Sequence, residues 1–338
     1  MDQQEEQPAA TLMRLVSGFQ VSQAISVASE LGIADLLGDG PRDADQLAAT
    51  TGSHPRSLYR LLRALAGAGV FREDPDGRFA LTPLGDCLCS DATGSVAPLA
   101  VFFGQPDYWQ AWGDLRHSVQ TGEYAFRHVH GMSPWEYRVR HPEAGAVFDQ
   151  AMTGRSWAEA EAALAAYDFG RFGTVVDLGG GQGAFLAALL ARHQGTRGVL
   201  FDQAHVVARA QPLLEAAGVA DRCRIEAGSI FESIPEGGDA YVLKRVLHDW
   251  EDEDALAILR MCRRVIGTDQ PLLIIDWVIS QGPEGAAAKL FDLAMLVSPG
   301  GRVRTRDEWA ALLRATDFRL ANIYPTRAGE HVIEATPA

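Results

Sequence analysis

The residues with the clearest chemistry form a glycine-rich turn between an apolar run and a predicted helix. The run covers residues 174–178 and includes Asp177, and the turn supplies Gly179, Gly180, Gly181 and Gly183. Because glycine has no Cβ, it tolerates positive φ and lets the backbone approach a ligand closely. A helix over 184–191 would direct its free N–H groups and positive dipole end at that ligand. The G-x-G-x-G spacing differs from the G-x-G-x-x-G of dinucleotide sites, so it predicts a nucleotide-like cofactor without identifying it.

An acid follows at the place where such a site needs one. Residues 198–201 form a second short apolar run, and Asp202 ends it, 23 residues after Gly179. An acid near this position accepts the ribose hydroxyls in nucleotide-binding folds. The alternative is a solvent-exposed Asp202 that opens the next helix at Gln203. We favour the cofactor role because the turn and the acid occur together.

A histidine and two acids follow the next buried strands. The run 239–244 is followed closely by His248 and Asp249, and Asp276 closes the run 272–276. Imidazole has a pKa near 6.5, which suits removal of a phenolic proton at neutral pH. Asp276 would then hold the imidazole in one tautomer. The alternatives are a packing role for His248 and a strand-stabilising role for Asp276.

The elements that carry these residues alternate between strand and helix. Their predicted ranges are 174–178, 184–191, 198–202, 203–217, 223–227, 239–243, 252–266, 271–277, 305–316 and 318–324. Such alternation predicts a parallel, doubly wound sheet, and ligands bind such sheets beyond the carboxyl ends of the strands. The pattern therefore brings Asp177, Asp202, Lys244 and Asp276 to one crevice.

The N-terminal part shows helices followed by a hairpin. Apolar residues recur at helical spacing over 11–37, a short helix opens near 43–48, a stronger helix covers 53–65, and 69–82 predicts the hairpin. This is the winged-helix arrangement, which often binds DNA. A formal net charge of −14 and only one basic cluster, within 53–65, argue against DNA binding. We expect a dimerisation or scaffold role instead.

Length and composition fit two globular domains. The 338 residues are 47% hydrophobic, which is sufficient for two cores. The four cysteines show no CxxC pairing, and no His/Cys/carboxylate grouping in the sequence indicates a metal. The sequence has neither an apolar N-terminal signal segment nor a run of 18 apolar residues. We therefore expect a soluble, cytoplasmic protein without metal, membrane or nucleic-acid partners.

Longer strings extend these motifs into a family resemblance. They are VVDLGGGQG at 175–183, LKRVLHDWEDEDALAILRMC at 243–262, DLAMLVSPGGRVRTRDEWAALL at 292–313 and LGIADLL at 31–37. Almost end to end, the chain resembles the small-molecule O-methyltransferases of the plant caffeate and bacterial aromatic-polyketide types. The resemblance implies an α/β fold: a doubly wound, Rossmann-like domain that binds S-adenosylmethionine (SAM), with an N-terminal α-helical, winged-helix-like dimerisation domain. The implied boundaries are 1–97 for the dimerisation domain, 98–155 for a helical linker and substrate-pocket segment, and 156–338 for the catalytic domain.

The resemblance also implies roles for individual residues. The enzyme would methylate a phenolic hydroxyl of an aromatic polyketide or similar secondary metabolite, with His248 as the general base that takes the phenolic proton and with Asp249 and Asp276 as the other catalytic residues. SAM would be held by Asp177, Gly179, Gly180, Gly181, Gly183, Asp202, Gln203, Ser229, Ile230, Lys244 and Arg245. The aromatic acceptor would be bound by Phe148, Met152, Trp157 and Met295. Family enzymes form homodimers through the N-terminal domain and release S-adenosylhomocysteine.

Three features depart from the family pattern. The segment after the second strand lacks the usual Leu-Pro, Ser229 replaces an aspartate that contacts adenine, and Val303 replaces a glutamate near the base. Without that glutamate, Asp276 alone would orient His248. Three other interpretations stay open. They are a SAM-binding enzyme with non-methylating chemistry (hydroxylation, decarboxylation or a pericyclic step), a SAM-sensing DNA-binding regulator, and a nicotinamide-dependent oxidoreductase, which the glycine spacing disfavours.

Overall fold

The computed structural model describes residues 7–92, 94–282 and 284–338. It divides the chain into two compact units. The first contains the residues up to 109 together with 141–155, and the second contains 110–140 and 156–338. The segment 98–155, predicted to be one linker and pocket region, is therefore shared between the two units.

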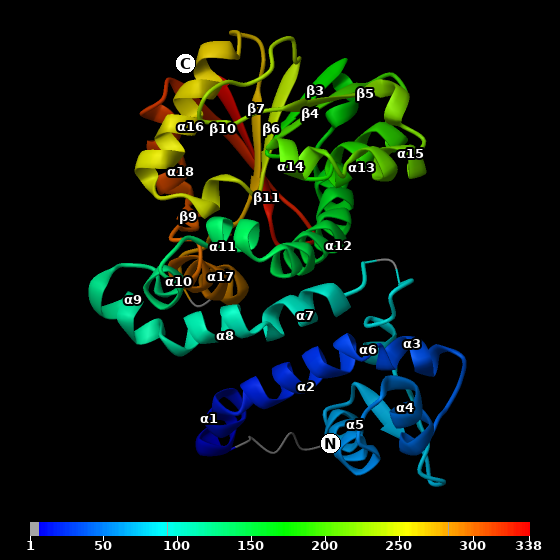
Figure 1. The fold of residues 1–338 in the computed structure, drawn as a ribbon. Helices are drawn as coiled ribbons and strands as arrows, with labels where there is room; N and C mark the ends of the chain where they lie inside the picture. The colour runs from blue at the N-terminus through cyan, green and yellow to red at the C-terminus, as the bar shows by residue number, and fades with distance from the viewer. Residues whose placement is uncertain (1–6, 93, 283) are drawn as a thin grey trace. The chain divides into compact units, whose positions relative to one another are not determined.

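The first unit consists of helices and one small hairpin; its N-terminal part is drawn in blue in Figure 1. Its elements are α1 (Pro8–Val16), α2 (Gly18–Glu30), α3 (Ile33–Gly38), α4 (Ala44–Thr51), α5 (Pro55–Gly67), β1 (Phe71–Glu73), β2 (Phe79–Leu81), α6 (Pro83–Asp86), α7 (Ala97–Gly104) and the first residues of α8 (Pro106–Gly113) and α12 (Pro142–Ala166). Helices α3, α4 and α5 share an apolar core with the hairpin, centred on Ile33, Leu47, Leu62 and Phe79. This order of helices and hairpin confirms the predicted winged-helix arrangement.

Local signals explain where these elements begin and turn. A reciprocal capping box between Asp43 and Gln46 starts α4. The hairpin closes where the Asp74 N–H donates to the Arg78 carbonyl at 2.7 Å, and Gly77 supplies the positive φ of 79° that this turn requires.

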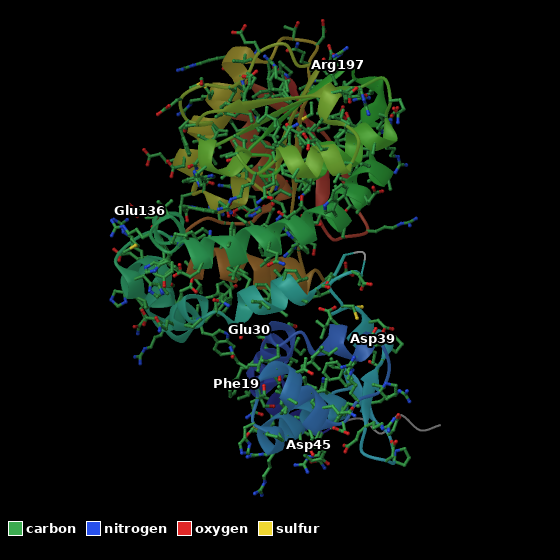
Figure 2. All side chains as sticks on the ribbon, turned by 45° about the vertical axis from the view of Figure 1, so that its right-hand side comes forward. Phe19, Glu30, Asp39, Asp45, Glu136 and Arg197 are labelled. Carbon is green, nitrogen blue, oxygen red and sulfur yellow. The ribbon has the colours of Figure 1, made fainter. Side chains whose placement is uncertain are left out.

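The second unit is built on a seven-stranded sheet with helices on both faces (Figure 1). Its strands are β3 (Thr174–Leu178), β4 (Arg197–Asp202), β5 (Cys223–Ala227), β6 (Ala240–Lys244), β7 (Leu272–Asp276), β10 (Phe318–Pro325) and β11 (His331–Pro337). The strand order is β10-β11-β7-β6-β3-β4-β5. Strands β7, β6, β3, β4 and β5 run parallel, whereas β11 pairs antiparallel with both β7 and β10. Arg197, labelled in Figure 2, begins β4, so the carboxyl ends lie at the opposite edge of the sheet.

Successive residues of each strand enter two apolar cores on opposite faces. Val175 and Val242 enter the core that includes α13 and α15, whereas Val176 and Leu243 enter the core that includes α16 and α18. The strands are continuously apolar because both faces of the sheet are buried. This confirms the doubly wound, Rossmann-like fold class. The prediction of an all-parallel sheet is wrong at one edge, where β10 and β11 form a hairpin and β11 follows no crossover helix that would reveal it.

The helices of the second unit are the remainders of α8 and α12, α9 (Leu115–Thr121), α10 (Ala125–His130), α11 (Pro134–Arg140), α13 (Ala184–Arg192), α14 (Ala204–Val207), α15 (Gln211–Ala216), α16 (Asp252–Val265), α17 (Ala286–Val297) and α18 (Arg306–Arg314). Short 3₁₀ turns cover Phe169–Arg171, Ala220–Arg222 and Leu247–Asp249, and β8 (Val278–Ile279) pairs in parallel with β9 (Arg304–Thr305). The single predicted helix over 203–217 is wrong. Pro212 lacks an N–H and clashes with a preceding helical turn, so two short helices replace it.

No helix in the described part of the chain is both long and apolar enough to span a bilayer. The cytoplasmic location stays a prediction.

Candidate active site

The glycine turn lies at the carboxyl end of β3 and is tied to the end of β4. The N–H groups of Gly179 and Gly180 donate to the Phe201 carbonyl at 2.8 and 3.3 Å. Gly179 and Gly181 have φ angles of 70° and 61°, which side-chain-bearing residues rarely adopt. At Gly180, a Cβ atom would come within 2.5 Å of the Asp177 carboxylate. The turn therefore requires glycine, and it leaves backbone exposed to close approach at the edge where ligands of such sheets bind.

Asp202, the last residue of β4, holds the turn from the other side. Its Oδ2 accepts the Gly181 N–H at 2.8 Å, and its Oδ1 accepts the N–H of Gln203 at 2.6 Å. Gln203 itself is exposed. The predicted acid and the predicted turn are therefore in direct contact, although they are 21 residues apart in sequence.

Asp177 is a buried acid directly below the turn. It is fully buried, and neither of its carboxylate oxygens has a hydrogen-bond partner among the residues that the structure describes. Burial raises the pKa of Asp177 to about 7, and the neighbouring Lys244 opposes this rise. Buried polar groups are nearly always hydrogen-bonded in native proteins. The carboxylate therefore fits a site whose ligand, or a water beside it, brings hydrogen-bond donors.

Lys244 and Arg245 lie in a buried network with two glutamates. Lys244 Nζ is 2.8 Å from Glu159 Oε2 and donates to Ser156 Oγ at 3.0 Å. Arg245 Nη1 lies 3.4 Å from Glu159 Oε1 and 3.5 Å from Glu330 Oε1. Arg245 also has a φ of 57°, a strained value that persists only where the surroundings enforce it. Both cations are thus paired with protein acids, and their contact with the cofactor stays a prediction.

His248 follows β6 and is paired with the acid that ends β7. The residue is 2% exposed, and its Nδ1 lies 2.8 Å from Asp276 Oδ1. The same oxygen accepts the Trp277 N–H at 2.8 Å, which fixes the carboxylate. A carboxylate partner at Nδ1 assigns the imidazole proton to that nitrogen and leaves the lone pair on Nε2. The pair can therefore accept a proton at Nε2 and stabilise the resulting charge at Nδ1.

Asp249 lies on the Nε2 side of the same ring. Its Oδ1 is 3.5 Å from His248 Nε2, and its side chain is 21% exposed, whereas Asp276 is fully buried. Burial raises the pKa of Asp249, and the charges of His248 and Arg245 oppose that rise. The structure therefore brings all three predicted catalytic residues together.

The predicted acceptor-binding residues are divided between the two units. Phe148 and Met152 belong to the first unit, where the Phe148 ring packs edge-on against Phe102 with centroids 5.5 Å apart. Trp157 and Met295 belong to the second unit; Trp157 packs against the core beside α13, and Met295 is 8% exposed. Their contact with an acceptor stays a prediction.

The structure also describes the surroundings of the positions at which the sequence departs from the family pattern. The Ser229 hydroxyl accepts the Phe231 N–H at 3.3 Å, and Ile230 packs against the core beside α16. Val303 is 2% exposed, so an apolar side chain is buried at the position of the family glutamate.

The sequence pattern does not reveal three residues of the site: Phe291, Glu159 and Glu330. The Phe291 ring lies edge-on to the His248 ring with centroids 5.0 Å apart, and the Arg245 guanidinium carbon is 5.0 Å from the Phe291 centroid. Glu159 lies in α12, where the apolar residues do not gather on one face, so the sequence does not mark this acid as buried. Phe291 and Glu330 reach the site only through tertiary packing, so no local pattern indicates them.

The fold also creates groupings of possible metal ligands that the sequence does not show. In the described residues, Asp114, His117 and His128 bring donor atoms within 4.8 Å of one another. His128 Nδ1 is already 2.7 Å from Asp114 Oδ2, as in an ordinary ion pair. That the protein binds no metal ion stays a prediction.

Comparison with known proteins identifies both parts of the chain. Residues 13–91 match the O-methyltransferase dimerisation domain and residues 112–319 match the O-methyltransferase domain. The chain is 42% identical to a phenazine O-methyltransferase of Lysobacter antibioticus, over 97% of this chain and 96% of that protein. It is 40% identical to 8-amino-8-demethylriboflavin N,N-dimethyltransferase of Streptomyces davaonensis, over 98% of this chain and 96% of that protein.

A solved structure carries the same fold with its ligands. It is an O-methyltransferase from neocarzinostatin biosynthesis in complex with SAM and 2-hydroxy-5-methyl naphthoic acid, similar to this chain with a TM-score of 0.80 and 31% identity over 94% of this chain and 96% of that one. The family matches cover more than half of the chain, and the strand-end residues lie together as such an enzyme requires. The chain therefore belongs to the O-methyltransferase family with an N-terminal dimerisation domain, and it is a SAM-dependent O-methyltransferase of secondary metabolism.

Proposed function

We propose that this enzyme methylates a phenolic hydroxyl of an aromatic secondary metabolite, with His248 as the general base. The observation that carries the proposal is the buried contact between His248 Nδ1 and Asp276 Oδ1, which leaves the Nε2 lone pair available. A phenol has a pKa near 10, so it becomes a strong nucleophile only as it loses its proton. His248 Nε2 takes that proton while Asp276 stabilises the imidazolium through Nδ1–H.

The other strand ends hold the cofactor. SAM, when bound, supplies a methyl group on a sulfonium, which is already strongly electrophilic. The glycine turn and Asp202 would hold it, and Asp177 offers a carboxylate that lacks a hydrogen-bond partner among the described residues. The protein then has to align the acceptor oxygen and exclude water, and such positioning contributes about 7–11 kcal/mol in well-oriented reactions.

A second candidate is methylation of an aromatic amine. It is favoured by the 40% identity to an N,N-dimethyltransferase. A neutral amine attacks with its own lone pair and loses its proton afterwards, so it needs a base less than a phenol does. The buried His248–Asp276 pair therefore favours the hydroxyl.

Met295 is the predicted acceptor-binding residue with the best support. It lies four residues after Phe291 on α17, so both side chains are on the same side of the helix. Because the Phe291 ring contacts His248, we assign this face of α17 to the acceptor.

We propose a homodimer because helix α1 exposes apolar side chains. Leu12, Met13, Leu15 and Val16 are each at least 61% exposed, an apolar surface that a chain rarely leaves in water. The match to the dimerisation domain begins at residue 13 and includes the last three of these residues. Light scattering of the purified protein should give twice the chain mass, and Leu15→Glu should lower it.

The proposal is tested by product analysis with matched acceptors. The enzyme is incubated with SAM and with hydroxynaphthoates, hydroxyphenazines and their amino analogues, and S-adenosylhomocysteine and methylated products are measured. We expect turnover of hydroxyl acceptors, and His248→Ala should lower their kcat by about 10²–10⁴-fold while the Kd for SAM changes less than about threefold.

His205→Ala, a change at an exposed histidine of α14, is the control and should behave as wild type. Full activity of His248→Ala would refute the base assignment, and turnover of only the amino acceptors would favour N-methylation. A chemically changed acceptor without S-adenosylhomocysteine would indicate non-methylating chemistry. Salt-sensitive binding to duplex DNA would revive the regulator hypothesis.

A further inference from the structure

Arg304 is a fully buried arginine whose hydrogen bonds converge on the segment that carries the base. Its Nη1 donates to the Leu247 carbonyl at 2.9 Å, and its Nη2 donates to the Trp250 carbonyl at 3.0 Å. These two carbonyls stand on either side of His248 and Asp249. One guanidinium group therefore fixes the backbone at both ends of the catalytic segment.

The charge of Arg304 is balanced at the start of the next helix. Asp252 Oδ1, at the first residue of α16, accepts from Arg304 Nε at 3.0 Å and from Nη2 at 2.8 Å. The guanidinium also lies over the Trp309 ring, 5.5 Å from its centroid. Burial of an arginine is costly unless its donors are satisfied, and here the planar fork satisfies them in fixed directions. A lysine would keep the charge but could not bridge both carbonyls and the carboxylate in this way.

The loop before Arg304 packs directly on the same backbone. A Cβ atom on Gly301 would overlap the His248 carbonyl and the Asp249 backbone, so the two segments are in van der Waals contact. The Val303 N–H donates to Asp292 Oδ1 at 2.8 Å, which ties this loop to α17. Residues 301–304 therefore connect the base segment to the helix whose Phe291 ring packs against His248.

We propose that Arg304 is a positioning residue for His248. It holds the backbone of 247–250 so that Nδ1 stays on Asp276 and Nε2 stays directed at the acceptor, and this inference rests on the proposed role of His248. Val303 gives the loop no carboxylate to orient the ring, so the loop acts on the base through the guanidinium instead. Misplacement of a reacting group by about 1 Å can lower a rate about 10²-fold.

A first experiment needs no acceptor. Hydrogen–deuterium exchange of full-length Arg304→Lys is compared with wild type and with Arg314→Lys, a matched change at an exposed arginine that ends α18. For Arg304→Lys, we expect exchange in the peptide covering 247–250 to be at least tenfold faster than in wild type. The control should exchange at the wild-type rate. The glycine turn at 179–183 should exchange as in wild type. Unchanged exchange at 247–250 would overturn the proposal.

A double-mutant cycle then separates positioning from a general loss of structure. Arg304→Lys should lower kcat about 10- to 100-fold with the Kd for SAM within about threefold of wild type. In the His248→Ala background it should cause less than about a threefold further loss, because the base that it positions is gone. An equal loss in both backgrounds would refute the positioning role.

The outcomes also distinguish the two proposals. Loss of activity in His248→Ala together with wild-type kcat in Arg304→Lys would overturn only the role of Arg304. Full activity in His248→Ala would overturn the base assignment and this inference with it. If Arg304→Lys does not fold, Asp252→Ala replaces it. Asp252 is 53% exposed and its loss leaves both carbonyl contacts, so we expect a three- to tenfold loss of kcat with the same dependence on His248.

Discussion

The ends of β3 and β4 and the ends of β6 and β7 lie along one edge of the same sheet, but their polar groups are used differently. At β3 and β4, backbone N–H groups and carboxylates meet in a glycine turn, and both oxygens of Asp177 lack a hydrogen-bond partner among the described residues. At β6 and β7, Asp276 Oδ1 holds the His248 ring and Arg304 holds the backbone on either side of it, and only Oδ2 of Asp276 lacks a partner among the described residues.

The two ends therefore differ in readiness: the Asp177 carboxylate has no protein partner among the described residues, whereas His248 is already paired with Asp276. A buried carboxylate with no hydrogen-bond partner costs free energy until a donor arrives, so we expect the bound cofactor to complete the β3–β4 end. At the β6–β7 end, Asp276 Oδ1 pairs with the proposed base inside the protein, which orients the His248 ring before the acceptor binds. Changes at the first end should alter mainly SAM affinity, and changes at the second should alter mainly kcat.

Among the acids of the site, the largest effect should follow from Asp276→Asn at the β6–β7 end. The amide keeps the shape of the side chain but removes the charge that stabilises the imidazolium, so kcat should fall about 10²–10³-fold. The Kd for SAM, measured by calorimetry, should change less than about threefold. A matched change on the other side of the ring, Asp249→Asn, should lower kcat by at most about tenfold. A larger loss from Asp249→Asn would mean that the proton resides on Nε2 and that the two acids have exchanged roles.

At the cofactor end, Asp202→Asn should act on affinity. A charged hydrogen bond contributes about 1.5–3 kcal/mol, so loss of the carboxylate should raise the Kd for SAM about 10- to 100-fold. At saturating SAM, kcat should stay within about threefold of wild type, because the base is untouched. Asp221→Asn, at an exposed acid before β5, is the control. A fall in kcat with unchanged SAM affinity would contradict the division of labour between the two ends.

The sequence predicts the first end almost completely because its parts are local. The glycine turn and Asp202 each follow a buried strand, and the register between β3 and β4 brings them together without further information. His248 and Asp276 are predictable for the same reason. The alternation of strands and helices likewise predicts the doubly wound sheet.

What the sequence does not predict depends on tertiary packing. Arg304 reaches the base segment from more than 50 residues away, and Glu159 reaches Lys244 from 85 residues away. No local spacing rule connects such positions, because a buried ion pair between distant residues becomes apparent only when the folded structure brings both partners together. Strand β11 is hidden for a similar reason, since its place between β7 and β10 is set by pairing and not by its own pattern.

The smallest expected effect concerns the stability of the fold. It tests whether the Asp177 carboxylate lacks a hydrogen-bond partner in the free enzyme. Asp177 has a pKa of about 7 in the folded enzyme, raised by burial, whereas in the unfolded chain an aspartate titrates near 3.9. Between these values the folded state keeps a proton that the unfolded state has lost. The contribution of Asp177 therefore lowers stability as pH rises from about 4 to about 7, and it levels off above that.

Asp177→Asn removes this titration, so without SAM the variant should melt close to wild type at pH 4 and a few degrees above it at pH 8. Differential scanning calorimetry across this range measures the gap, with the exposed Asp221→Asn as the control. The gap should narrow when SAM is added, because a ligand that satisfies the carboxylate stabilises wild type more than the amide variant. Parallel melting curves at all pH values would mean that Asp177 is already satisfied in the free enzyme, and the contrast between the two strand ends would then disappear.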